Sequence, residues 1–268
     1  MEGIKCVLLD IEGTVCPISF VKEKLFPYAL NALPDVLASK WDSKEFKSYR
    51  DAFPADARGS PSALQAHVED LTQRDVKAAY LKNLQGYLWE TGYKTGAYST
   101  PLFADVLPKL KEWNDAGIKL AIYSSGSVFA QKLLFGHVQS AAGQKKARGE
   151  SENQDPLSKA TVGGKARLDD AQPQPEDVQY LISDWFDTTN AGPKMEYSSY
   201  DMIRVVLEIT AQEVLFLSDN VKECDAAIAA GMRSLIVDRP GNAPLPDWDS
   251  DKLSIVKSLE DVHIKYQE

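Results

Sequence analysis

Residues 4–14 read IKCVLLDIEGT and place two carboxylates directly after a short apolar run. An apolar run of this length, which begins at Ile4 and stops at Asp10 and Gly13, is typical of a strand buried on both faces of a parallel sheet. Open α/β sheets bind ligands beyond the carboxyl ends of their strands. The segment therefore predicts an α/β fold in which Asp10 and Glu12 lie at a ligand-binding edge.

The chemistry of these two acids suits phosphoryl transfer. Asp10 is a candidate nucleophile, because a carboxylate can attack a phosphoryl group and form an acyl phosphate that water then hydrolyses. Glu12 could protonate the leaving oxygen and later deprotonate the attacking water. Both could also converge on one metal ion. A single D-x-E-G-T segment more often ends a strand in a solvated turn, so this interpretation needs support from the rest of the chain.

Composition excludes several classes of protein. At 268 residues the chain is long enough for one large domain or for a core that carries an inserted smaller one. A net charge of −9 without a basic stripe disfavours a nucleic-acid or membrane partner. The three cysteines lack metal-site spacing and indicate free thiols in a reducing compartment. Because no signal peptide or apolar run of about 18 residues is visible, we expect a cytoplasmic or nuclear protein.

Residues 18–116 separate the two acids from the next apolar strand and show helical spacing without a convincing strand. They predict an all-helical cap, 18–116, inserted into an α/β core of residues 1–17 and 117–268. The expected helices cover 18–39, bent or divided at Pro27 and Pro34, then 61–91, interrupted at Gly86, and 101–116, capped by Thr100.

Beyond residue 117 the pattern alternates between strand and helix, which predicts a doubly wound, mostly parallel sheet. Residues 139–177 are polar and poor in large apolar side chains, so we expect a mobile surface loop there; a charged recognition tail is the alternative. The expected strands are 118–123, 179–183, 214–217 and 233–237. One expected helix follows the first of these strands and ends at 135, and two others cover 195–209 and 220–230. A short terminal helix is expected after residue 238.

Two further segments could bind an anion at the same sheet edge. Ser124 ends the strand 118–123 and begins an SSGS turn that leads into a helix, so its hydroxyl and nearby N–H groups can face an anion. The alternative is an ordinary helix cap by Ser127. Lys194 precedes a predicted helix and could neutralise both a phosphate and the nucleophile, although most such lysines are simply solvated.

Asp219 follows the strand 214–217, and Glu223 comes four residues later. Asp219 suits Mg²⁺, which is usually held by one or two carboxylates together with water and phosphate oxygens. Glu223 could hold a metal-bound water or orient Lys194. Read separately, Asp219 could be a helix cap and Glu223 a solvated residue. Taken in order, the segments supply a nucleophile, an acid/base, an anion cradle, a positive clamp and a metal ligand for phosphoryl transfer.

This ordered set resembles the haloacid dehalogenase superfamily over nearly the whole chain. The resemblance implies a doubly wound core with a helical cap, a nucleophile at Asp10 and a general acid/base at Glu12. It also implies one Mg²⁺ ion held by Asp10, by the main-chain carbonyl of Glu12 and by Asp219, with the phosphate surrounded by Ser124, Ser125 and Lys194.

A narrower resemblance rests on the segments DIEGT at 10–14, LQGYLWETGY at 84–93 and IYSSGS at 122–127. They are similar to the enolase-phosphatase family of methionine salvage, also called acireductone synthases. The segments 131–136, 186–188 and 239–243 extend the likeness, whereas 139–177 looks longer than the usual connection. The resemblance implies enolisation of 2,3-diketo-5-methylthiopentyl 1-phosphate and then loss of phosphate, which gives the acireductone 1,2-dihydroxy-3-keto-5-methylthiopentene. For the enolisation base, Glu12 is the first choice and an unidentified cap residue the other.

Three residues of a predicted helix fall at positions i, i+4 and i+8, namely Gln85, Trp89 and Tyr93. They share one face of the helix, which shifts gradually around the helix axis. They are either core packing or a cap surface that closes over the apolar methylthio tail and excludes water. The alternative functions are another capped phosphatase or phosphomutase for a small phosphate ester, a halide-releasing hydrolase, or a binding protein without activity. We expect a monomer whose partner is a small phosphate ester.

Overall fold

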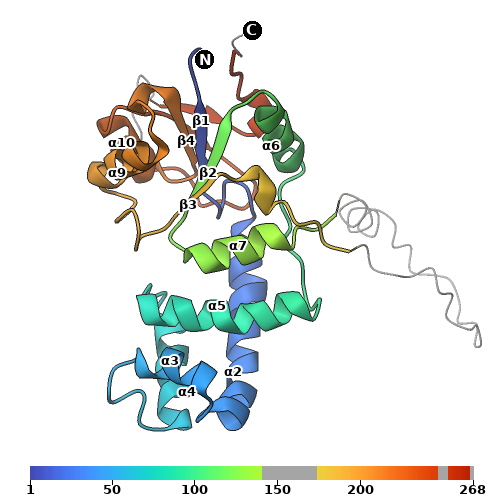
Figure 1. The fold of residues 1–268 in the computed structure, drawn as a ribbon, viewed down its shortest axis with the longest axis vertical. Coiled ribbons are helices and arrows are strands. Elements are labelled where there is room, and N and C mark those ends of the chain that lie inside the picture. Colours follow the sequence, from blue (N-terminus) through green and yellow to red (C-terminus); the bar gives the residue numbers. More distant parts are fainter. Residues whose placement is uncertain (141–173, 247–252, 266–268) are drawn as a thin grey trace, which may run out of the picture.

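The computed structural model describes residues 1–140, 174–246 and 253–265, and within them one parallel sheet forms the centre of the fold (Figure 1). The strand order is β3-β2-β1-β4-β5-β6, so the chain runs outward from β1 in both directions. This confirms the predicted doubly wound α/β fold. The strands are β1 (Cys6–Leu9), β2 (Lys119–Tyr123), β3 (Asp184–Phe186), β4 (Val214–Ser218), β5 (Arg233–Val237) and β6 (Ser254–Val256).

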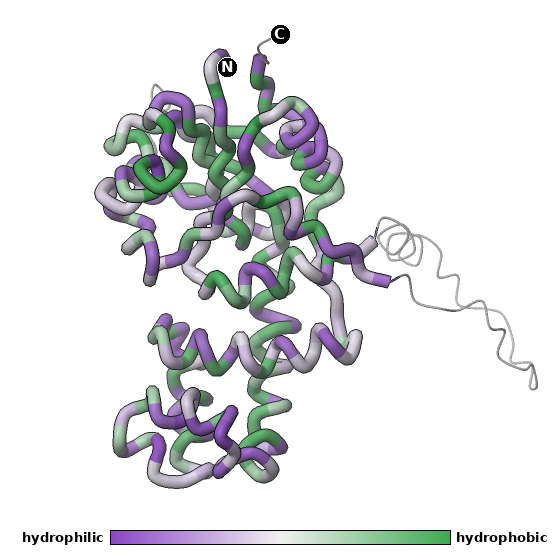
Figure 2. The backbone as a smooth tube through the Cα atoms, viewed as in Figure 1, coloured by the Kyte–Doolittle hydropathy of each residue, from purple (hydrophilic) through white to green (hydrophobic). Residues whose placement is uncertain are grey.

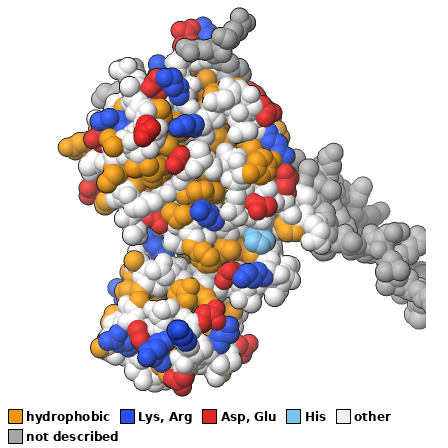
Figure 3. Space-filling view, viewed as in Figure 1, with side chains coloured by type: hydrophobic (Ala, Val, Ile, Leu, Met, Phe, Trp, Pro, Cys, Tyr) orange, Lys and Arg blue, Asp and Glu red, His pale blue; other side chains and the backbone are white. Residues whose placement is uncertain are grey.

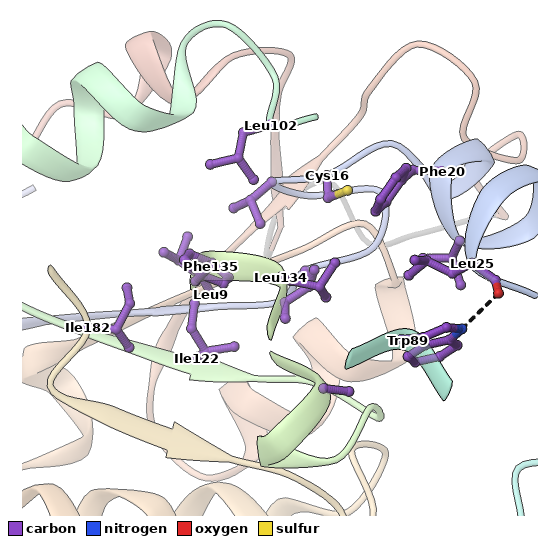
Figure 4. Packing of buried hydrophobic residues seen from close by; sticks show 14 of the residues in the cluster. Leu9, Cys16, Phe20, Leu25, Trp89, Leu102, Ile122, Leu134, Phe135 and Ile182 are labelled. Atoms are coloured by element: carbon purple, nitrogen blue, oxygen red, sulfur yellow. Dashed lines mark hydrogen bonds between the residues drawn. The ribbon is translucent and has the colours of Figure 1, made fainter. Parts of the chain in front are cut away.

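The sheet is covered on both faces because alternate residues of β1 enter different hydrophobic clusters. Val7 and Leu9 pack with α6 (Val106–Asp115) and α7 (Val128–Gly136), whereas Cys6 and Leu8 pack with α9 (Tyr197–Leu207) and α10 (Val221–Ala229). Successive side chains of a strand point to opposite faces, so a continuous apolar run is what such a strand requires. Figure 2 shows hydrophobic residues along the strands, and Figure 4 shows Leu9 packed near Ile122 and Phe135.

A helical lobe, residues 18–94, lies beyond the carboxyl ends of the strands and forms the lower part of Figure 1. Residues 18–116 contain no strand beyond the single bridge between Thr100 and Val138. Although α6 falls inside the predicted cap range, it packs against β2 of the sheet. The lobe consists of α1 (Ile18–Phe20), a π-helical turn (Val21–Leu25), α2 (Phe26–Lys40), α3 (Lys44–Asp51), α4 (Pro61–Gln73) and α5 (Ala79–Lys94).

Several helix predictions in this part were wrong. Neither Pro27 nor Pro34 divides the first helix, which continues to Lys40. Gly86 does not interrupt its helix but lies inside α5, where an added Cβ would come within 3.1 Å of the Phe129 ring on α7. The break falls instead at 74–78, between α4 and α5. Thr100 is not a cap, because its backbone pairs with residues 137 and 139, and α6 begins only at 106.

The second half of the core also differs from the prediction in detail. The apolar run at 179–183 forms a 3₁₀ turn, Gln179–Leu181, and the strand begins only at Asp184. Only Leu181 and Ile182 of this run are buried, and so short an apolar run has no period that separates strand from turn, which explains the error. The expected terminal helix is reduced to a 3₁₀ turn, Leu259–Asp261, and the unpredicted strand β6 precedes it.

The predicted loop 139–177 falls mostly on residues 141–173, which lie outside the described residues. Its two ends are joined by an antiparallel bridge between Val138 and Glu176, and Lys111 forms an ion pair with Glu176 at 2.9 Å. On the face drawn in Figure 3, basic and acidic side chains are interspersed and no basic stripe is present. Among the described helices, none combines the length and the apolar character that a membrane span requires.

Candidate active site

Asp10 and Asp219 follow neighbouring strands and therefore lie at one sheet edge. Leu9 of β1 pairs with Leu217 of β4, and the Asp10 backbone N–H donates to the Leu217 carbonyl at 2.9 Å. Adjacent strands are about 4.8 Å apart, so the residues that follow them are neighbours. Gly13, at φ +75°, turns the loop that follows β1 back toward Asp219. A Cβ on Gly13 would come within 2.5 Å of Asp219 Oδ2. The structure thus brings together the two acids that the sequence placed on separate strands.

Lys194 joins the predicted nucleophile to Glu223. Its Nζ lies 2.6 Å from Asp10 Oδ1 and 2.5 Å from Glu223 Oε2, and all three side chains are buried. Burial alone would disfavour the ammonium, but the carboxylates of Asp10 and Glu223 outweigh it and raise the pKa of Lys194. The Ser218 hydroxyl donates to the same Glu223 oxygen at 2.9 Å. Lys194 is therefore held as a cation against the Asp10 carboxylate.

Negative charge exceeds positive charge at this edge. Burial and then the nearby Asp10 and Glu223 raise the pKa of Asp219 to about 7. Burial and then Asp10 also raise the pKa of Glu12, which favours the protonated acid at this position. Carboxylates that repel one another in this way are the usual setting for a bound cation.

The donor set fits a divalent cation bound largely by water and substrate. In the described part of the chain, no cluster of three His, Cys, Asp or Glu side chains could hold an ion. Mg²⁺ does not need one, because one or two carboxylates with water and phosphate oxygens complete its shell. Asp10 and Asp219 can supply those carboxylates.

Three residues hold the loop after Asp10 in place, and the sequence analysis assigned no role to them. Thr14 Oγ1 accepts from the Asp219 backbone N–H at 3.1 Å, and the Thr14 carbonyl accepts from Arg239 Nε at 3.0 Å. Asn242 Nδ2 donates to the Gly13 carbonyl at 2.9 Å. Arg239 and Asn242 follow β5, the strand next to β4, so their place beyond a strand end was the signal that could have identified them.

The serine turn, residues 124–127, lies at the end of β2, on the other side of β1 from β4. Ser124 is buried, and its hydroxyl accepts from the Gly126 N–H at 3.3 Å. Ser127 caps α7 by accepting from the Ala130 N–H, so the capping alternative holds for Ser127. Ser124, Ser125 and Ser127 all line a cavity next to this helix N-terminus. Hydroxyl and N–H groups in such a turn can bind an anion.

That cavity, of about 260 Å³, lies between the helical lobe and the core. Glu12 and the serine turn line it from the core, and α5 lines it from the lobe. Asp10, Lys194 and Asp219 are not among its lining residues. Glu12 is thus the predicted catalytic residue that faces the cavity, whereas the ion-paired cluster lies outside its lining.

The structure separates the three predicted cap residues. Gln85 and Trp89 line the cavity, and Trp89 Nε1 donates to the Leu25 carbonyl at 2.7 Å (Figure 4). Tyr93 does not line it; this ring stacks on His137, and the hydroxyl bonds to Thr100 at 2.9 Å. Lys82, which sequence reasoning missed, lines the cavity one turn before Gln85. The spacing 82, 85, 89 on one helix face was the available signal.

Comparison with known proteins supports a single family. Residues 4–231 match the model for haloacid dehalogenase-like hydrolases. The chain is 51% identical over 262 residues to the enolase-phosphatase E1 of Pyricularia oryzae, covering 97% of this chain and 99% of that protein. It is 52% identical over 264 residues to the enolase-phosphatase E1 of Sordaria macrospora, with 98% and 99% covered.

Solved structures agree with this match. The crystal structure of the UTR4 protein of Saccharomyces cerevisiae is similar with a TM-score of 0.75 and 38% identity, covering 97% of this chain and all of that one. The CbbY protein of Rhodobacter sphaeroides, solved in complex with phosphate, has a TM-score of 0.55 at 15% identity over 97% of each chain, which shows the shared fold alone. The chain therefore belongs to the haloacid dehalogenase-like hydrolases and, among them, to the enolase-phosphatase E1 family.

Proposed function

We propose that the chain converts 2,3-diketo-5-methylthiopentyl 1-phosphate to the acireductone 1,2-dihydroxy-3-keto-5-methylthiopentene and phosphate, with one Mg²⁺ ion as cofactor. The observation that carries this proposal is the 2.6 Å contact between Lys194 and Asp10 at the sheet edge that Asp219 shares. A buried carboxylate held by an ammonium, beside a second carboxylate, is the arrangement that attack on a phosphate ester requires.

In this mechanism Asp10 attacks phosphorus and forms an aspartyl phosphate. Lys194 reduces the repulsion between the incoming phosphate and the carboxylate. Glu12, whose pKa burial and then Asp10 raise, can hold a proton before phosphoryl transfer and give it to the leaving oxygen. It then accepts a proton from the water that hydrolyses the aspartyl phosphate.

The remaining residues bind substrate and cofactor. The Ser124 hydroxyl and the Ser125 N–H hold phosphate oxygens at the start of α7. Asp10, the main-chain carbonyl of Glu12 and Asp219 would hold Mg²⁺, which when bound polarises phosphoryl and carbonyl oxygens. Trp89 and Leu25 line the cavity with apolar surface, which suits a methylthio tail and limits the entry of water.

A single assay tests this function. Purified protein, Mg²⁺ and the diketo phosphate are combined, and the ultraviolet absorbance of the enol is followed together with free phosphate in the same sample. We expect both signals to rise, and EDTA to prevent the release of phosphate. Turnover of sugar phosphates without turnover of the diketo phosphate would instead identify another capped phosphatase or a phosphomutase.

The replacement Gly13→Ala should weaken Mg²⁺ binding by about 10- to 100-fold, because its methyl group would collide with Asp219 Oδ2, 2.5 Å away, and displace a ligand. The measurement is a Mg²⁺ titration of phosphate release. Gly3→Ala is the matched control, since Gly3 has a similar φ of +73° but open space around a Cβ. It carries the same backbone strain without the collision. Equal Mg²⁺ titrations for the two variants would contradict the placement of Asp219 at the metal.

A further inference from the structure

Lys82 connects the helical lobe to the phosphate-binding turn of the core. Its Nζ donates to the Ser125 carbonyl at 2.6 Å, and the residue lines the same cavity as Glu12 and Ser124. Lys22 and Lys77 also line this cavity but are exposed, whereas Lys82 is half-buried. Of these three lysines, Lys82 is thus the half-buried one, and its ammonium contacts the core.

The position of Lys82 matches one particular atom of the proposed substrate. With the phosphate held by Ser124 and Ser125, the ester oxygen is followed by C1 and then by the C2 carbonyl. That carbonyl must therefore lie beside the serine turn, where Nζ of Lys82 is held. A cationic donor aimed at an oxygen that gains negative charge is an effective stabiliser of an enolate. Glu12, on the same cavity wall, is placed to reach the C1 hydrogens.

We propose that Lys82 is the proton donor of the enolisation step, an assignment that rests on the proposed function. The Glu12 carboxylate takes a proton from C1, and the C1–H electron pair becomes the C1=C2 double bond. The π pair of the C2 carbonyl moves onto its oxygen, which takes a proton from the Lys82 ammonium. The products are the enol and a neutral amine, and the amine regains its proton from water.

This assignment also explains how two reactions can share one acid/base. The proton that Glu12 removes from C1 is the proton that the leaving oxygen needs in the following phosphoryl transfer. Burial and then Lys77 lower the pKa of Lys82, so it gives up a proton more readily than a surface lysine does. Lys194 cannot take this role, because both Asp10 and Glu223 hold it in the buried cluster.

The test separates enolisation from phosphate binding. The first probe is the phosphonate analogue of the diketo substrate, in which a methylene replaces the ester oxygen, so that it can enolise but cannot release phosphate. Enol absorbance and deuterium uptake at C1 in D₂O report enolisation. The second probe is inorganic phosphate, whose Kd in the presence of Mg²⁺ reports phosphate binding at the serine turn. The variants are Lys82→Met, Lys82→Arg and the charge-matched control Lys22→Met, since Lys22 also lines the cavity but is exposed.

We expect Lys82→Met to slow enolisation by about 100-fold, the usual cost of losing one such donor. This loss should exceed any change in the phosphate Kd, and the loss in Lys22→Met, by at least about tenfold. If circular dichroism shows that Lys82→Met is unfolded, Lys82→Arg decides. A guanidinium keeps the charge and the contact between lobe and core but does not give up its proton, so enolisation should still fall while phosphate binding remains.

Three results would overturn the assignment. The first is unchanged enolisation in the folded Lys82 variants. The second is an equal loss of enolisation and of phosphate affinity, which would make Lys82 a phosphate clamp. The third is an equal loss in Lys22→Met, which would indicate a general effect of charge in the cavity. If wild-type protein neither enolises the phosphonate nor converts the diketo phosphate, the proposed function itself fails, and this outcome is distinct from the other three.

Discussion

Replacement of Asp10 by Asn is expected to abolish phosphate release, with a rate at least about 10⁴-fold below that of the wild type. The amide has the volume of the carboxylate but cannot attack phosphorus or form the aspartyl phosphate. Its oxygen can still accept the hydrogen bond from Lys194, which lies 2.6 Å from Asp10 Oδ1. The fold should therefore remain. The measurements are phosphate release at saturating Mg²⁺ and the circular dichroism spectrum of the variant.

Asp225→Asn provides the matched control for this experiment. This substitution makes the same change of charge on the exposed side of α10, because Asp225 lies two residues after Glu223 but outside the buried cluster. Its activity should remain close to that of the wild type. Near-normal phosphate release by Asp10→Asn would refute the assignment of the nucleophile, whatever the control shows.

Replacement of Lys194 by Met is expected to remove activity and also to destabilise the protein by about 3–5 kcal/mol, the usual cost of breaking a buried ion pair from one side. The methionine leaves Asp10 and Glu223 buried without the cation that now lies within 2.6 Å of both. Urea unfolding in the absence of Mg²⁺ measures the free energy of unfolding. The rate of phosphate release measures the effect of losing the positive charge beside Asp10.

Two further variants show whether burial is the cause. Lys265→Met breaks an ion pair of the same length, 2.6 Å, with Glu2, but both side chains are 74% exposed. Such surface pairs contribute about 0–1 kcal/mol, so this control should unfold almost like the wild type. Adding Glu223→Gln to Lys194→Met removes one of the two orphaned charges and should restore part of the stability. Similar losses for the two lysine variants would show that Lys194 does not neutralise a buried cluster.

Much of this site could be predicted because its signals are local in sequence. The acids Asp10, Glu12 and Asp219 each come within a few residues of a buried strand end, and parallel strands deliver such residues to one edge. Lys194 was identifiable only as one member of an ordered set. In the serine turn the two interpretations were compatible, because Ser127 caps α7 and also lines the cavity with Ser124.

Other features depend on contacts between distant segments, which the local spacing of residues does not determine. Lys82 reads as an ordinary helix lysine until α5 is packed across α7 at Gly86, where Phe129 lies close. Tyr93 shares the spacing of Gln85 and Trp89, yet it packs on His137 instead of lining the cavity. The run at 179–183 failed as a strand because the two buried residues Leu181 and Ile182 suit a turn as well as a strand.

The sequence by itself determined the sheet, its ligand-binding edge and the chemistry of the acids there, because strand burial and strand termination depend on neighbouring residues. Only the tertiary structure decided that Lys194 binds Asp10 and Glu223 together, and that α5 brings Lys82 to the serine turn. Those contacts join residues far apart in the chain. Their geometry is set by how the helical lobe packs on the core, and no local pattern of side chains specifies that packing.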